Sequence, residues 1–413
     1  LLALGLNGIV GVGIFFAPAE VAARVPGPAG LSVYIVTALA LLPIALTYAA
    51  LGGRFDRDGG PYVWAREAFG PRVAFGVGWI AYVSALFSTS AVVVGLAQHA
   101  GPPLGFSGEA GVRMFALIVL AVVTAVNAAG LRPSAAAWDA VTVLKLVPLF
   151  VLIAAFLWVR PSAPAVQESV VSFDSFQRAM LVVLFALQGF EIVPVPAGHV
   201  KNTRFAVPFA TLAAPLGAAV LYVLLHAACV WSLPGLARAD APLVEAGRAL
   251  GGQNLASLME VGTNVSAFGI CLGMVAMSPR YLTALGTREG LGAWLGREDA
   301  RRVPQRALWI TVLVVCVLAQ LGALGELLAL SSVAVLAQYG VTAAALLVLA
   351  ARRVGGLTRW HMLPAPLALL AIVMIAQGAT TNELLVAGGV LALGLGLLFL
   401  RRRVRHASTS GSD

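Results

Sequence analysis

Gly8-Ile9-Val10-Gly11-Val12-Gly13-Ile14-Phe15 interrupts the first long apolar stretch of the chain with three closely spaced glycines. A second interruption follows about five apolar stretches later, at Gln188-Gly189-Phe190-Glu191, with Pro194 and Pro196 just beyond it. A helix broken inside a bilayer exposes backbone groups, and these are tolerated only where they line a cavity or bind something. Two breaks at corresponding places in two halves of a chain indicate the substrate site of a transporter.

The composition is typical of a chain that lies mostly in lipid. Of 413 residues, 60% are hydrophobic and only 11% are charged, whereas soluble domains carry about 25% charged residues. We count about 12 apolar stretches that are long enough to cross a hydrocarbon core of ~30 Å. The predicted spans are 1–25, 29–52, 73–100, 113–130, 138–159, 177–199, 206–232, 255–286, 306–323, 326–351, 363–379 and 383–400. The longest polar connections are 53–72, 233–254 and 287–305. The sequence therefore predicts an all-α polytopic membrane protein.

Positive charge is distributed unevenly between the two sides of the membrane. The formal net charge of +9 would by itself also suit a nucleic-acid-binding protein. With the loops numbered alternately, 20 of the 27 Lys and Arg residues fall on the side of the N-terminus and 6 on the other. Because positive loops stay in the cytoplasm, we expect both termini there, in a multi-pass protein of the cell (inner) membrane without a nucleic-acid partner.

The positions of the two breaks predict internal symmetry. Breaks in spans 1 and 6 imply a repeat unit of five spans, and an odd number makes the second unit enter the bilayer from the opposite side. We therefore expect a 5+5 inverted repeat with broken helices 1 and 6. Residues 1–159 form the first five-helix repeat and 177–351 the second, followed by two additional helices in 363–400 and a basic cytoplasmic tail, 401–413.

The glycines of the first break suit a zwitterionic ligand. Gly11 and Gly13 flank Val12 and allow a ligand to approach the backbone closely. The half-helix that begins near Ile14 presents its positive dipole end to a carboxylate, and carbonyls at the end of the preceding half-helix suit an ammonium group. The alternative is close helix packing through small residues, which is common in membranes. The second break, at Gly189, favours the substrate site.

Two ionisable residues fall at membrane depth. Glu191 lies in the second break, where it either serves transport or makes a structural hydrogen bond that holds the broken helix. Lys145 is the only lysine within a predicted span, and a charged lysine near mid-bilayer costs roughly 2.5–3.5 kcal/mol. Burial disfavours its charged form, so it could bind and release a proton. The alternative is snorkelling to the interface.

A series of short motifs runs in order through about 290 residues of the chain. They are Gly11-Val12-Gly13-Ile14-Phe15 with Pro18, Gly59-Gly60-Pro61-Tyr62-Val63-Trp64, Phe69-Gly70, Gly78-Trp79, Asn127 with Gly130, Gly189-Phe190-Glu191, Ala197-Gly198-His199-Val200-Lys201-Asn202, Pro208, and Arg280 with Arg288-Glu289-Gly290-Leu291. Each is weak alone, but together they resemble the amino acid–polyamine–organocation (APC) superfamily of transporters over nearly the whole chain. His199 and Thr203 depart from that pattern, since many members have Glu and Pro there.

The resemblance implies a LeuT-type fold, alternating access and an α-amino acid or related amine as substrate. The residues that would contact the substrate are Gly11, Val12, Gly13, Ile14, Phe185, Ala186, Gln188, Gly189 and Ser332. The first four would face its carboxylate, and carbonyls of the span 6 residues would face its amino group. Lys145 falls where proton-linked or sodium-independent members keep a lysine in place of a sodium ion. Ser331-Ser332 could equally bond back to their own helix.

The sequence favours a secondary active transporter of amino acids, proton-linked and sodium-independent, with Lys145 and Glu191 as coupling residues. Neutral substrates are favoured because spans 3 and 8 offer an apolar lining. An exchanger and a transport-inactive amino acid sensor stay open as alternatives. An enzyme is disfavoured because the five histidines and three cysteines form no catalytic or metal-binding pattern, and we expect no cofactor. The sequence does not define which amino acid is carried or the oligomeric state.

Overall fold

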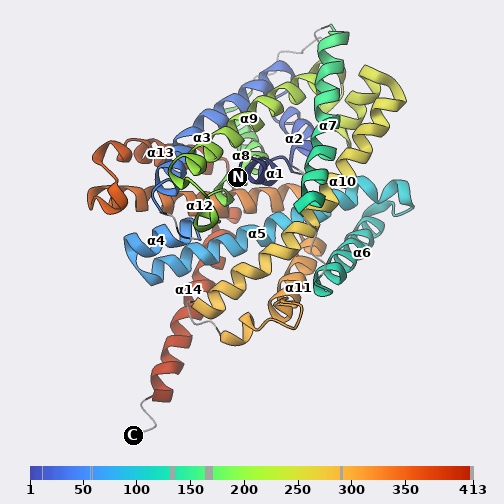
Figure 1. Ribbon diagram of the computed structural model, residues 1–413. Coiled ribbons are helices and arrows are strands. Elements are labelled where there is room, and N and C mark those ends of the chain that lie inside the picture. Colours follow the sequence, from blue (N-terminus) through green and yellow to red (C-terminus); the bar gives the residue numbers. More distant parts are fainter. Residues whose placement is uncertain are drawn as a thin grey trace.

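The computed structural model describes residues 1–11, 13–55, 57, 59–130, 135–162, 171–288 and 292–409, and these form helices and connecting turns without a β-strand. The long helices pack side by side in one bundle (Figure 1). The α-helices are α1 (Leu2–Ile9), α2 (Gly13–Ala22), α3 (Gly30–Gly52), α4 (Pro61–Phe69), α5 (Pro71–Ala100), α6 (Gly108–Ala128), α7 (Ala135–Val159), α8 (Phe173–Leu187), α9 (Thr203–Ser232), α10 (Pro242–Arg288), α11 (Gln305–Leu321), α12 (Leu324–Ala351), α13 (Pro364–Ala376) and α14 (Thr381–Thr409).

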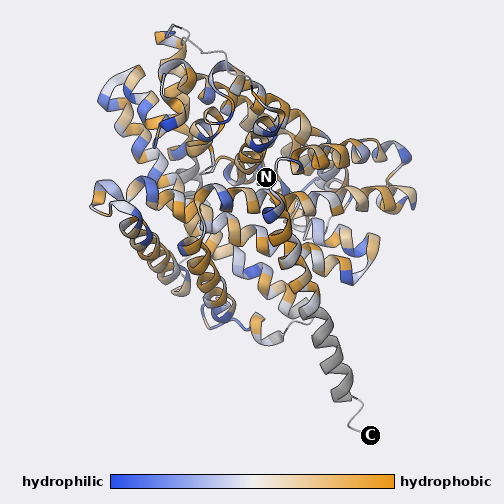
Figure 2. Cartoon of the chain, turned by 180° about the vertical axis from the view of Figure 1, so that it is seen from behind, coloured by the Kyte–Doolittle hydropathy of each residue, from blue (hydrophilic) through white to orange (hydrophobic). Residues whose placement is uncertain are grey.

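Apolar residues cover the outside of the bundle as well as its inside (Figure 2). Leu39 on α3, Leu313 on α11 and Leu370 on α13 are 63%, 66% and 66% exposed. An outer surface of this kind is typical of helices that face lipid. Within the described residues, seven helices are long and apolar enough to cross a membrane, or eight when α1 and α2 count as one bent span. The chain is therefore an all-helical polytopic membrane protein, and the total of about 12 spans stays a prediction.

Two of the predicted polar connections contain helix. The connection 53–72 contains α4, which begins at Pro61 and buries Trp64. In the connection 233–254, α10 already begins at Pro242, and the helix bends where Gly251 and Gly252 leave helical geometry.

The helix of the sixth predicted span stops at the predicted interruption. Residues 177–199 were predicted as one span broken at Gln188-Gly189-Phe190-Glu191, and α8 runs from Phe173 to Leu187. The chain continues through the 3-10 turns η3 (Phe190–Ile192) and η4 (Ala197–His199). Prolines 194 and 196 lack backbone N–H donors, so a regular helix cannot resume across them.

Two buried clusters of side chains meet at the end of α8. One cluster gathers mainly from α3, α8, α9 and α12, and the other mainly from α5, α6, α10 and α11. Ile14 and Ala186 belong to the first cluster, whereas Phe185 belongs to the second. α2 packs against α8, α3 packs along α9, and α5 packs along both α10 and α12. The end of α8 is thus placed where the two halves of the core meet.

Candidate functional site

The first break exposes carbonyl oxygens that side chains of two other helices hold. α1 ends at Ile9 and α2 begins at Gly13, with a bend of 46° between them. Lys145 Nζ, on α7, donates to the carbonyl oxygens of Asn7 (3.1 Å) and Val10 (2.6 Å). The Tyr222 hydroxyl, on α9, donates to the carbonyl oxygen of Ile9 (2.9 Å). The break is therefore a shared contact point of α1, α7 and α9. Val12 lies outside the described residues.

The Lys145 side chain ends inside the protein rather than at its surface. Only 2% of its surface is exposed, and its ammonium group points to the carbonyls of the first break. A hydrogen bond from a charged donor contributes about 1.5–3 kcal/mol. Two such bonds offset the roughly 2.5–3.5 kcal/mol that a charged lysine costs near mid-bilayer. The charged form is therefore compatible with this buried position.

The second break lies backbone to backbone against the first. Gly189 follows the end of α8 with a φ of +120°, a conformation that L side chains rarely adopt. A Cβ atom at Gly189 would collide with the carbonyl group of Gly8. In turn, a Cβ at Gly8 would lie 3.0 Å from the Gly189 carbonyl oxygen. Glycine at both positions therefore allows the two breaks to touch.

Glu191 holds the second break in place. Its carboxylate accepts hydrogen bonds from the Gly189 backbone N–H (2.8 Å) and from the Tyr339 hydroxyl of α12 (2.9 Å). The first bond closes a local turn, and the second ties that turn to α12. These two hydrogen bonds are of the kind expected if Glu191 has a structural role and holds the broken helix. They also place a titratable group directly at the broken segment.

Most of the predicted contact residues gather at the junction of α2 with α8. A Cβ at Gly13 would lie 2.8 Å from Ala186 Cα and 3.2 Å from Phe185 Cδ1. Ile14 is fully buried, and Gly11 lies against Ile270 of α10. The first N–H groups of α2 and the last carbonyls of α8 are helix ends, which lack partners within their own helices. The junction therefore brings helix-end donors and acceptors together in close packing.

The Gln188 side chain joins a cluster of hydroxyl groups. Its Nε2 donates to Ser331 Oγ of α12 (3.1 Å) and to Ser88 Oγ of α5 (3.3 Å), and the two serine hydroxyls lie 2.6 Å apart. Among the described residues, the buried Gln188 Oε1 has no hydrogen-bond partner. The uncharged Gln188 amide therefore lies beside the second break, and its Oε1 atom is an acceptor that is not used.

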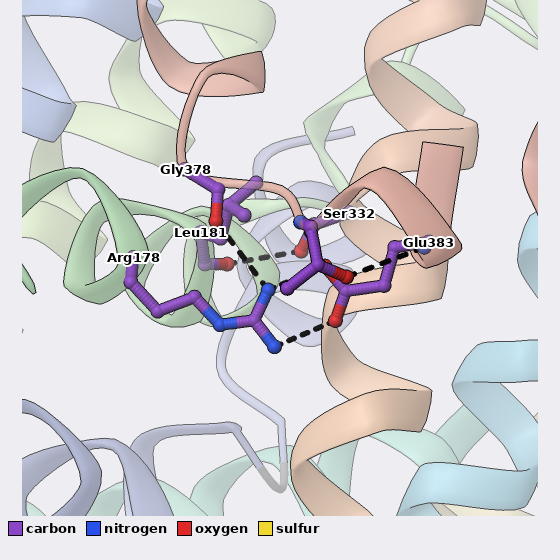
Figure 3. Close-up of polar contacts among 6 residues, drawn as sticks. Arg178, Leu181, Ser332, Gly378 and Glu383 are labelled. Carbon is purple, nitrogen blue, oxygen red and sulfur yellow. Dashed lines mark hydrogen bonds and ion pairs between the residues drawn. The ribbon is translucent and has the colours of Figure 1, made fainter. Parts of the chain in front are cut away.

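Ser332, the serine predicted to contact substrate, points elsewhere. Its hydroxyl donates to the carbonyl oxygen of Leu181 on α8 (2.9 Å), as Figure 3 shows. Neighbouring residues of a helix are ~100° apart around its axis, so only one of the two serines can face Gln188. That serine is Ser331, whereas Ser332 ties α12 to α8 away from the junction.

Figure 3 also shows an ion pair that ties α8 to the C-terminal helices. The Arg178 guanidinium on α8 donates to both carboxylate oxygens of Glu383 on α14, with Nη2 and Oε1 2.6 Å apart. Its Nη1 also donates to the carbonyl oxygen of Gly378 (3.4 Å). The start of α8, the helix that leads into the second break, is therefore anchored outside the predicted repeats.

Two contacts of the breaks escaped the sequence reasoning. Tyr222 carries a hydroxyl within an apolar span, and such a buried group needs a partner. That need was its only signal in the sequence. The Gly59 backbone N–H donates to the carbonyl oxygen of Val195 beyond the second break (2.9 Å). The Gly59-Gly60 motif was noticed, but its contact with the segment after α8 joins residues too far apart in sequence for any local pattern to predict.

Comparison with known proteins places the chain among transporters. The profile of an amino acid permease family matches residues 1–386. An uncharacterised transporter of Mycobacterium tuberculosis is 28% identical over 422 residues, which cover 99% of this chain and 92% of that protein. A methylthioribose transporter of Bacillus subtilis is 24% identical over 371 residues, with 84% and 79% covered. A branched-chain amino acid permease of Lactococcus lactis is 26% identical over 351 residues, with 77% and 73% covered.

Proposed function

This chain belongs to the amino acid permease family and is a transporter rather than an enzyme, and we propose that it carries neutral amino acids across the cell membrane by alternating access, linked to protons and independent of sodium. The observation that carries the proposal is the meeting of the two helix breaks, with the Lys145 ammonium on the carbonyls that the first break exposes.

The helix ends at the junction match an α-amino acid. N–H groups at the start of α2 attract the substrate carboxylate, and carbonyls at the end of α8, including those of Phe185 and Ala186, accept from its amino group. Gly13 packs too closely against Ala186 for a ligand to lie between them. Substrate therefore enters when α2 and α8 separate, which is the movement that alternating access requires.

The predicted inverted repeats are supported by which helices pack together. In the division into 1–159 and 177–351, α3 and α9 are the second spans of the two repeats, and α5 and α10 are the third spans. Each of these equivalent pairs is in contact, as are α2 and α8 from the two broken spans. A two-fold axis that passes between the repeats brings equivalent elements together in this way. α13 and α14 then form the two additional helices.

Lys145 is the coupling group of the proposed mechanism. While it is protonated, its ammonium group holds the end of α1 against α7. Proton loss removes the charge that strengthens these bonds, so α1 is released more easily. Glu191 acts at the second break, where its contact with Tyr339 depends on the ionisation of the carboxylate. Both titratable groups therefore act on the two broken segments that bind substrate.

A preference for neutral substrates is supported by the groups around the second break. Gln188, Ser88 and Ser331 are uncharged and can bind a polar group, but they offer no counter-ion to a charged side chain. The unused Gln188 Oε1 is an acceptor for a substrate donor. A small or hydroxylated neutral amino acid fits this chemistry better than arginine or glutamate.

Uptake into proteoliposomes tests the proposal. A thermal-shift screen of the purified protein against amino acids and amines, with methylthioribose included because of the relative that carries it, first identifies a ligand. We expect a neutral amino acid whose uptake is equal in sodium and choline media and rises with an inward proton gradient. Uptake that needs sodium contradicts the coupling. Uptake only into vesicles preloaded with amino acid identifies an exchanger, and binding without uptake identifies a sensor.

A further inference from the structure

Two hydrogen-bond donors face one another near the end of α3 and the start of α13. In the 3-10 turn η8 (Arg359–Met362), the Thr358 backbone N–H donates to His361 Nδ1 (3.0 Å). A backbone N–H can only donate, so Nδ1 is the acceptor nitrogen and Nε2 carries the proton. Arg54 Nη2, two residues beyond α3, lies 3.4 Å from that Nε2. The Thr358 hydroxyl lies 2.8 Å from Nδ1 as well and can donate to it. Since a guanidinium also only donates, an acceptor from outside the protein can bind both N–H groups.

The surroundings of the Arg54–His361 pair are basic and held in position. Among the described residues, neither Arg54, Arg353 nor Arg359 has a carboxylate within salt-bridge distance. Arg54 packs on the turn η7 (Val354–Gly356), where a Cβ at Gly356 would lie 3.5 Å from Arg54 Nη1. The guanidinium is therefore placed before any ligand arrives, which reduces the entropy cost of binding an anion.

An apolar stripe leads away from this pair along α13. Trp360, directly before His361, is 80% exposed. Leu363, Leu367 and Leu370 are 62%, 60% and 66% exposed, and their spacing puts them on one helix face. A tryptophan beside basic residues at the end of an apolar helix is typical of the interface between lipid head groups and acyl chains. A ligand here meets N–H donors at one end and hydrocarbon-contacting side chains at the other.

We propose that Arg54 and His361 bind the phosphate of an anionic phospholipid whose acyl chain lies along the Leu363–Leu370 stripe of α13. Phosphate oxygens supply the acceptors that the two donors lack, and arginine is well suited to phosphate. The apolar stripe selects a lipid over a soluble anion. Since the site joins the end of α3 to the start of α13, bound lipid fastens the second predicted span to the C-terminal helices.

Lipid titration of the full-length protein in detergent tests this assignment. Dioleoylphosphatidylglycerol binding is followed by native mass spectrometry and by the rise in melting temperature, with dioleoylphosphatidylcholine and inorganic phosphate as comparison ligands. We expect Arg54→Gln to weaken phosphatidylglycerol binding about fivefold, which corresponds to the ~1 kcal/mol of one basic residue near an anionic surface. Arg297→Gln, which removes the same charge from the exposed connection between α10 and α11, is the matched control and should bind as the wild type does.

His361→Phe is the second variant, because it removes the Nε2 donor and leaves Arg54 in place. It should weaken phosphatidylglycerol binding without changing phosphatidylcholine binding. Equal phosphatidylglycerol affinity in Arg54→Gln, His361→Phe and Arg297→Gln would overturn the site. Inorganic phosphate that displaces the lipid and raises the melting temperature equally would overturn its assignment to a phospholipid and identify a soluble anion instead.

Discussion

Replacing Lys145 with methionine removes its charge while keeping most of the side-chain volume. The two hydrogen bonds to the carbonyls of Asn7 and Val10 are lost, at about 1.5–3 kcal/mol each. The neutral side chain also avoids the roughly 2.5–3.5 kcal/mol that a charged lysine costs near mid-bilayer. The net destabilisation is therefore at most about 3.5 kcal/mol, which a folded membrane protein can survive. Function should change far more than stability.

Proteoliposomes with opposed internal and external pH provide the assay. The wild type should accumulate its substrate as the external pH falls, because protonation of Lys145 is linked to substrate binding. Lys145→Met should bind substrate but show uptake that no longer responds to the proton gradient. Circular dichroism and the melting temperature check that the variant is folded. A folded Lys145→Met protein with the wild-type pH profile would refute the coupling role.

Lys145→Arg tests whether the positive charge at this position is sufficient or whether the side chain must also release a proton. Arginine is not deprotonated in proteins, so this variant keeps a cation near the carbonyls of the first break but cannot release a proton there. We expect it to retain substrate exchange between equal concentrations and to lose accumulation driven by pH. Normal accumulation by Lys145→Arg would mean that proton release occurs at another group, for which Glu191 is the first candidate.

Three further changes address the junction, the break and the topology. Gly13→Leu places a side chain into Ala186, which costs about 1–3 kcal/mol through overpacking, and should abolish binding in a thermal-shift titration; unchanged affinity contradicts the site. Tyr222→Phe removes the donor to the Ile9 carbonyl, so unfolding should become easier by about 1–2 kcal/mol, with the pH profile of uptake retained. Ser408→Cys, with the native cysteines replaced, should react with an impermeant thiol reagent only after the cell membrane is opened; labelling of intact cells contradicts a cytoplasmic C-terminus.

Local chemistry predicted the helix ends at both breaks. α1 ends and α2 begins inside the first glycine segment, and α8 ends directly before the second, because glycine and proline act on the backbone of their own turn. That the chain is a membrane protein could also be predicted from composition, because each apolar span can be recognised from its own residues. Predictions that depend on one segment alone were therefore the ones the sequence could support.

Contacts between distant helices could not be predicted in the same way. The sequence placed Lys145 at depth, but which carbonyls it reaches depends on how α7 packs against α1. Ser331 and Ser332 differ only by ~100° of helix rotation, and that rotation is fixed by the neighbours α5 and α8. The contacts of Tyr222 and Arg54 could not be predicted, because the Ile9 carbonyl and His361 are 213 and 307 positions away in the chain.

Lys145 and the proposed substrate contacts meet the same stretch of backbone, and this explains how proton binding could be linked to substrate binding. Lys145 binds carbonyls at the end of α1, and Gly8, within that end, touches Gly189 of the second break. A proton on Lys145 therefore changes the free energy of the arrangement in which substrate binds. Linkage is reciprocal, so protonation must raise substrate affinity by the same factor by which substrate raises proton affinity. Substrate affinity measured across pH should consequently vary in the wild type and be flat through the same range in Lys145→Met, which separates linkage at this break from a general effect of pH on the membrane.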